Sequence, residues 1–111
     1  MILIRFITGN ENQIEQIAKY LLQNQLVVNL NLKHPIKHLD LVNDEIHYSN
    51  KYILVGKTKS LLFNRIEKEI KELIDPNIEI YSLPIVQMDE AQTMELSSKV
   101  FKALTRPLTP Q

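Results

Sequence analysis

The chain has no cysteine and no tryptophan, and only two of its 111 residues are glycine. Without cysteine it can form no disulfide, no thiolate metal site and no cysteine nucleophile, so any bound metal would need nitrogen and oxygen ligands. Gly9 and Gly56 are too far apart in the sequence to build a glycine-rich phosphate loop. No stretch resembles a nucleophile elbow. We therefore expect no enzymatic activity and no catalytic residues.

The chain also has no excess of charge, because 13 Lys and Arg balance 13 Asp and Glu. A nucleic-acid-binding protein usually carries a basic surface for the phosphate backbone, which argues against a nucleic-acid partner. No apolar run approaches the roughly 18 residues of a membrane span, and the first residues do not have the pattern of a signal peptide. We expect a cytoplasmic protein without a membrane partner.

The length fits one domain with one hydrophobic core. We assign residues 1–104 to that domain. Residues 105–111, TRPLTPQ, are rich in proline and threonine without hydrophobic periodicity and are predicted to form a flexible tail.

The first half of the chain predicts a strand, a helix and a hairpin. Residues 2–8 form an apolar run typical of a central strand covered on both faces. Asn10 is expected to cap the helix that follows, with Gln13 as its capping-box partner. Apolar residues then alternate in 26–32, with Leu32 inward and Val27 outward. Pro35 should bend this strand and place it at a sheet edge before it turns at Asn43–Asp44 into a second strand.

The second half repeats the order of helix and strand. A helical stripe of Leu62, Ile66, Ile70 and Leu73 ends at Asp75–Pro76, and residues 78–85 form another strand. Residues 89–104 are predicted to form a third helix with Met94, Phe101 and Leu104 in the core. This order is that of an α+β, ferredoxin-like β-α-β-β-α-β sandwich, an antiparallel sheet with helices on one face and an added C-terminal helix. Its long apolar edge strand favours an oligomer.

Three stretches resemble the CutA family of divalent-cation-tolerance proteins: AKYLLQNQLVVNLNL at 18–32, KT at 57–58 and SLPI at 82–85. The resemblance covers about residues 2–95. It implies a ferredoxin-like homotrimer, close in architecture to the PII signalling proteins, with metal binding and metal tolerance as its usual attributions.

The chain departs from the family pattern at positions that bear on metal chemistry. Asn29 stands where the family usually has cysteine, and Asp40, Leu41 and Val42 replace hairpin aromatic residues. Asp44 replaces the turn glycine. The resemblance therefore supports a shared scaffold more strongly than shared metal chemistry.

The hairpin holds the predicted metal ligands. A two-residue turn places His38, Asp40 and His47 on one face, where imidazole and carboxylate groups suit a weakly bound Zn²⁺ or Cu²⁺. The alternative interpretation is an ordinary polar face in which His47 donates a hydrogen bond to Asp40. A site elsewhere would gather Asp75, Glu79 or Glu90 in a cleft between subunits.

Residues 57–59 are predicted to form a solvated turn, or otherwise to meet an anion at the next helix N-terminus. The leading functional hypothesis is a non-enzymatic, trimeric CutA-like protein of metal tolerance or signalling. The alternatives are a ferredoxin-like interaction module without a ligand site and an enzyme that uses clefts between subunits.

Overall fold

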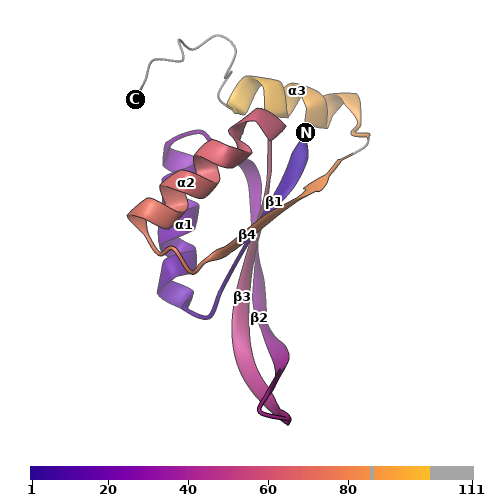
Figure 1. Ribbon diagram of the computed structural model, residues 1–111. Helices are drawn as coiled ribbons and strands as arrows, with labels where there is room; N and C mark the ends of the chain where they lie inside the picture. The colour runs from indigo at the N-terminus through magenta and orange to yellow at the C-terminus, as the bar shows by residue number, and fades with distance from the viewer. Residues whose placement is uncertain (86, 101–111) are drawn as a thin grey trace.

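The computed structural model describes residues 1–85 and 87–100. The elements are β1 (Ile2–Thr8), α1 (Glu11–Gln23), β2 (Val28–Val42), β3 (Glu45–Thr58), the short helix η1 (Ser60–Leu62), α2 (Phe63–Leu73), β4 (Glu79–Pro84) and α3 (Glu90–Lys99). All strand pairs are antiparallel, in the order β2-β3-β1-β4 (Figure 1). The predicted ferredoxin-like fold is confirmed. Phe101, Leu104 and the predicted tail lie outside the described residues.

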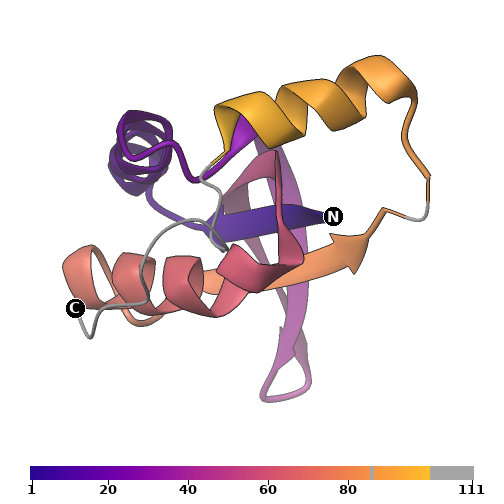
Figure 2. The ribbon, with the colours of Figure 1, turned by 90° about the horizontal axis from the view of Figure 1, so that it is seen from above.

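Helices α1 and α2 cover one face of the sheet, and α3 lies across the end of the sheet beside the start of β2 (Figure 2). The core is formed by alternate residues of β1 and by the apolar stripes of both helices, including Ile4, Phe6, Ile14, Ile17, Leu21, Ile66 and Ile70. The prediction that β1 is covered on both faces is wrong for the isolated subunit. Leu3, Arg5 and Ile7 are only partly buried on the second face, because neither α1 nor α2 reaches it.

Strand β2 does not keep the predicted alternation at its start. Its pairing with β3 shifts by one residue between Val28 and Asn31, and Asn29 has a φ of 54°. Such a bulge reverses which side chains face inward. Val27, predicted to point outward, is 3% exposed and lies against Gly56. Leu32 pairs with Leu54 on the helix-covered side, as predicted, but it is 56% exposed because β2 is an edge strand. A second shift follows between Lys33 and Ile36, where Pro35 was predicted to bend the strand.

Gly56 of β3 makes the first of these irregularities possible. A Cβ atom at this position would lie 2.7 Å from Leu30 Cδ2 and 3.4 Å from Val27 Cβ. The absence of a side chain therefore lets the bulged strand approach β3 closely.

Several predicted side-chain roles are corrected. Asn10 does cap α1, and its Oδ1 accepts a hydrogen bond from the Asn12 amide at 2.9 Å, but Gln13 does not complete a capping box. Gln13 instead accepts from the Thr8 hydroxyl at 2.6 Å and donates to Asp75 at 2.8 Å. Its side chain thus joins the end of β1 to the loop after α2.

Two residues predicted to pack in the core are exposed. Leu73 at the end of α2 is 63% exposed and Met94 on α3 is 64% exposed. Leu96 and Val100 are buried in place of Met94. The inward face of α3 is therefore different from the one its sequence predicted.

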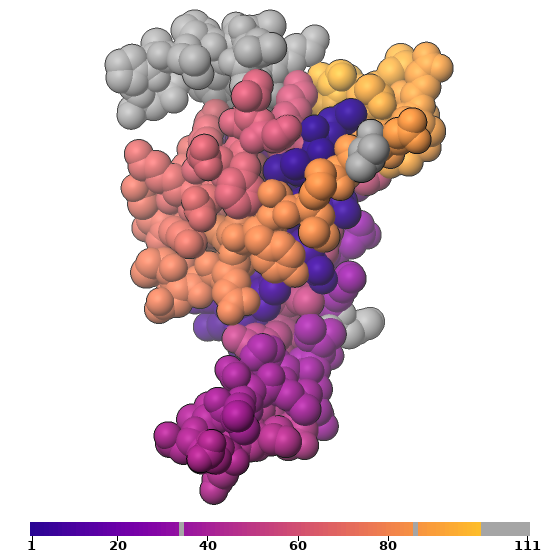
Figure 3. Space-filling view, turned by 45° about the vertical axis from the view of Figure 1, so that its right-hand side comes forward, coloured from indigo at the N-terminus to yellow at the C-terminus, as the bar shows by residue number. Residues whose placement is uncertain are grey.

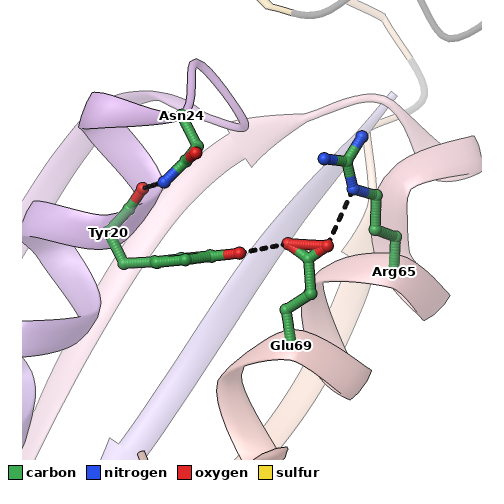
Figure 4. Close-up of polar contacts among 4 residues, drawn as sticks. All are labelled: Tyr20, Asn24, Arg65 and Glu69. Atoms are coloured by element: carbon green, nitrogen blue, oxygen red, sulfur yellow. Dashed lines mark hydrogen bonds and ion pairs between the residues drawn. The ribbon is translucent and has the colours of Figure 1, made fainter. Parts of the chain in front are cut away.

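A hydrogen-bonded group joins the two helices on the sheet (Figure 4). The Tyr20 hydroxyl of α1 donates to Glu69 Oε1 of α2 at 2.5 Å, and Arg65 Nε donates to Glu69 Oε2 at 2.9 Å. Burial, followed by the hydrogen bond to Glu69, raises the pKa of Tyr20 to about 12. Tyr20 therefore remains a neutral donor at all moderate pH values.

The β2–β3 hairpin projects well beyond the body of the subunit (Figures 1 and 3). We call residues 36–50 the arm; all of them are exposed. The arm lengthens the molecule to 51 × 34 × 22 Å and its radius of gyration to 15.5 Å, compared with about 13 Å for a compact domain of this size. Among the described helices, none is long and apolar enough to cross a membrane.

Candidate functional site

The arm is held by a tight turn in the predicted register. Asn43 and Asp44 have φ values of 50° and 64°, a left-handed pair that is typical of a two-residue hairpin turn and that Asn and Asp tolerate. Asp40 pairs with His47, and Leu39 pairs with Tyr48. The predicted separation of the two faces of the hairpin is therefore confirmed.

The predicted metal ligands lie on one face of the arm, but their side chains form two separate pairs. His38 Nε2 lies 3.9 Å from Asp40 Oδ2, and His47 Nε2 lies 4.0 Å from Glu45 Oε2. Over residues 1–85 and 87–100, no group of three His, Cys, Asp or Glu side chains is arranged to hold a metal ion. The described His, Asp and Glu side chains thus provide no preformed ligand set for a divalent cation.

The alternative interpretation of this face is not seen in its predicted form either. Asp40 Oδ1 accepts a hydrogen bond from the Leu41 amide at 2.9 Å instead of from His47. The Asp40 side chain therefore bonds the backbone of the next residue. Both histidines remain well exposed to solvent.

The other face of the arm is apolar. It carries Leu39, Leu41, Ile46 and Tyr48, each more than half exposed. Cross-strand pairing places Leu39 beside Tyr48 and Leu41 beside Ile46, so the four side chains form one continuous surface. Lys37 extends along it, with Nζ 5.6 Å from the centre of the Tyr48 ring. A continuous exposed apolar surface of this kind usually marks a contact with another molecule.

Asn29, which stands at the family's cysteine position, serves a structural role. Its Nδ2 donates to Glu95 Oε1 of α3 at 2.7 Å, and Lys99 Nζ lies 3.1 Å from Glu95 Oε2. The Asn29 hydrogen bond, followed by that of Lys99, lowers the pKa of Glu95 below its usual value. This contact fastens α3 to the bulge of β2.

A second polar contact holds the start of α3, and sequence reasoning missed it. Lys57 of β3 hydrogen-bonds Gln92 Oε1. Asp89 caps the helix, because its Oδ1 accepts a hydrogen bond from the Gln92 amide at 2.8 Å. This hydrogen bond lowers the pKa of the Asp89 carboxyl. Asp followed three residues later by Gln is a recognisable helix-start signal. It agrees with the predicted start of this helix at residue 89, but it could not identify the distant partner Lys57.

Residues 57–59 differ from their prediction, while a site between subunits at Asp75, Glu79 or Glu90 stays a prediction. Thr58 is fully buried and donates to the Leu26 carbonyl at 2.6 Å, so residues 57–59 are not a solvated turn. Asp75 is bound by the Asn77 amide and by Gln13, which lower the pKa of its carboxyl. Glu79 on β4 and Glu90 on α3 belong to other elements and are exposed.

Comparison with known proteins agrees with the fold. The family model described as CutA1 divalent ion tolerance protein matches residues 2–94. CutA1 from Pyrococcus horikoshii has a TM-score of 0.80 at 19% identity, over 92% of this chain and 100% of that chain. The periplasmic divalent cation tolerance protein CutA from Archaeoglobus fulgidus has a TM-score of 0.78 at 23% identity, over 91% and 100%.

A plant protein is similar to the same extent. CutA1 from Oryza sativa has a TM-score of 0.80 at 16% identity, over 92% of this chain and 94% of that chain. Comparison of the sequence with curated proteins gives no match.

Proposed function

Because the chain belongs to the CutA1 divalent ion tolerance family, we propose that it is a non-enzymatic homotrimer that acts in tolerance of divalent ions in the cytoplasm. The observation that carries this proposal is the projecting arm with its exposed apolar face. An isolated subunit would leave this surface in water. An oligomer would bury it.

The sheet edges support a closed ring of subunits. With the strand order β2-β3-β1-β4, the outer edges of β2 and β4 have no partner strand among the described residues. Contact between β2 of one copy and β4 of the next is head-to-tail, and such contacts form a ring when the rotation between copies closes. Family membership supports three copies per ring. In this arrangement the apolar face of the arm would pack on a neighbouring copy.

Light scattering on the purified protein tests this assembly. We expect a mass of three times the 13.0 kDa of one chain. A stable monomer at micromolar concentration would contradict the proposal.

We further propose that divalent ions bind weakly at His38, Asp40 and His47. Imidazole nitrogen suits Zn²⁺ and Cu²⁺, while the amide of Asn29 is a poor ligand and is already bonded to Glu95. Binding should be weak because the histidines lie in separate pairs with carboxylates and would have to rearrange. A contact module without a ligand is the second candidate, favoured by the absence of a preformed ligand group among the described residues.

Calorimetric titration with Zn²⁺ and Cu²⁺ distinguishes these two candidates. We expect weak binding that a His38→Ala, His47→Ala double variant abolishes and that decreases at acidic pH, because a protonated ring has no lone pair to donate. An Asn29→Ala variant, the control, should bind like the native protein. No binding at all would favour the contact module, and tight binding that survives in the double variant would place the metal elsewhere.

A further inference from the structure

The face of the sheet opposite α1 and α2 has an unsatisfied charged residue at its centre. Arg5 lies midway along β1, opposite Val55 of β3 and Tyr81 of β4. Its Nε is the one buried side-chain nitrogen or oxygen without a hydrogen-bond partner in the part of the chain that the structure describes. Buried polar groups almost always have a partner, so the exception indicates that a partner is missing from the isolated subunit.

The surroundings of Arg5 fix its position without neutralising its charge. Its guanidinium carbon lies 5.5 Å from the centre of the Tyr81 ring, a cation–π contact that orients the group. Glu79 is on the same face, opposite Ile7, but no ion pair between it and Arg5 occurs among the described side chains. Two other cations lie on this face: Lys57 is engaged with Gln92, and Lys33 on the edge strand β2 adds to the positive charge. The face therefore carries an uncompensated positive charge.

The next step rests on the trimer proposed above. A ring of three sheets has an inner and an outer surface. Figure 2 shows α1 and α2 on one side of the sheet, and we place this helix layer on the outside of the ring, where it has more room. The uncovered faces then turn toward the three-fold axis, which would also cover the partly buried Leu3, Ile7 and Val55. Figure 3 shows β1 reaching the molecular surface on this side.

Three Arg5 side chains would therefore meet around the axis with like charges. We propose that together they bind one small multivalent oxyanion, of the class of phosphate or a tricarboxylate. The guanidinium group presents its N–H donors in a fork that matches paired oxygens, and Nε is part of that fork. An anion on the axis satisfies the orphaned Nε donors and removes the repulsion between the three cations.

Thermal unfolding with inorganic phosphate tests the site. At about 100 times its dissociation constant, one anion shared by three subunits should raise the midpoint of the native protein by roughly 4 °C relative to chloride at equal ionic strength. Arg5→Gln should abolish the rise. Arg5→Lys should reduce it, because the charge remains while the fork is lost. Lys19→Gln, which removes an exposed cation from α1 on the other side of the sheet, is the matched control and should keep it.

Two further measurements keep the outcomes distinct. Light scattering on the native protein comes first, because a monomer would refute the trimer and this site together. Calorimetry on the native trimer should give one phosphate per three chains, and this result does not depend on whether the variants fold. A trimer that binds no phosphate, or whose Arg5→Gln variant shows the full rise, overturns the site alone. The site is also overturned if the native trimer does not respond to phosphate and Arg5→Gln dissociates it. A carboxylate of the neighbouring copy would then be the partner of Arg5.

Discussion

Single side chains join segments that are far apart in this sequence. Tyr20 and Glu69 are separated by 49 residues, yet their hydrogen bond connects the last turn of α1 to the middle of α2. Gln13 and Asp75 are 62 residues apart and connect the start of α1 to the end of α2 in the same way. Helix α1 is therefore bonded to α2 or its following loop near both ends of α1, in addition to packing on the sheet.

Replacement of Tyr20 by Phe should lower the free energy of unfolding by about 1 kcal/mol, the usual contribution of one such hydrogen bond. The pKa of Tyr20 is raised to about 12 from the ordinary value of 10.0 for tyrosine. Its contribution to stability is therefore full below pH 10 and is lost as the pH rises through 12. Urea unfolding of native and Tyr20→Phe proteins should show a difference at pH 8 that disappears at high pH. Tyr48→Phe, on the exposed arm, is the control and should match the native protein at pH 8.

At this scale the sequence predicted the buried apolar residues better than the polar ones. Ile14, Ile17 and Leu21 recur at helical spacing and are buried as expected. Gln13 was assigned to a local capping box because local spacing was the only information available. Its actual partners include Asp75, which only the folded chain brings near. The exposed side of β1 that carries Arg5 could not be predicted either, because an apolar sequence does not show that one face of the strand is left uncovered.

At the scale of elements, α3 is held differently from the other helices. Only Leu96 and Val100 bury apolar side chains there, and polar contacts with Asn29 and Lys57 fix its position. Its helical state could be predicted from sequence, but its inward face could not. Met94 was predicted to be buried, yet the contacts to β2 and β3 rotate the helix so that Leu96 points inward.

We expect Asn29→Asp to loosen α3, because it replaces a hydrogen-bond donor to Glu95 by a like charge. Amide hydrogen exchange in residues 90–99 should accelerate at neutral pH, while exchange in α1 should stay unchanged. The pKa of Glu95 is lowered in the native protein, so this contact stabilises α3 above the usual carboxyl pKa and is lost as the pH falls through the lowered value. Unchanged exchange in α3 would show that Leu96, Val100 and the Lys57 contact hold the helix without Asn29. Asn24→Asp, which alters an exposed residue beyond α1, is the matched control.

At the scale of the whole molecule, the arm dominates the shape and the expected assembly. A charge on its apolar face should disrupt the proposed trimer without unfolding the body, because every arm residue is exposed in the subunit. Leu41→Asp should therefore shift the mass from three chains toward one in light scattering, with unchanged circular dichroism. Ser49→Asp adds the same charge to the opposite face and should remain trimeric. A Leu41→Asp protein of native mass would exclude this surface from the interface.

The register of the arm was predictable because turn chemistry and strand alternation are local properties. Asn43–Asp44 fixed the pairing, and with it the face that His38, Asp40 and His47 share. Whether these side chains converge depends on rotamers in solvent, which strand register does not determine. The sequence therefore predicted their placement correctly, while their convergence on one ion stays a prediction.

The two irregularities in β2 have a consequence for how the arm can change in length. Between the bulge near Lys33 and the turn, every residue of β2 has a fixed partner in β3. Loss of one residue from either strand would slip the pairing and turn Leu39 and Leu41 to the side now held by His38 and Asp40. Loss of one facing residue from each strand next to the turn would shorten the arm but reverse nothing, since cross-strand partners share a face. Length variants of this hairpin should therefore be tolerated when residues are removed or added as cross-strand pairs, and single-residue gaps should be found only where a bulge can absorb them.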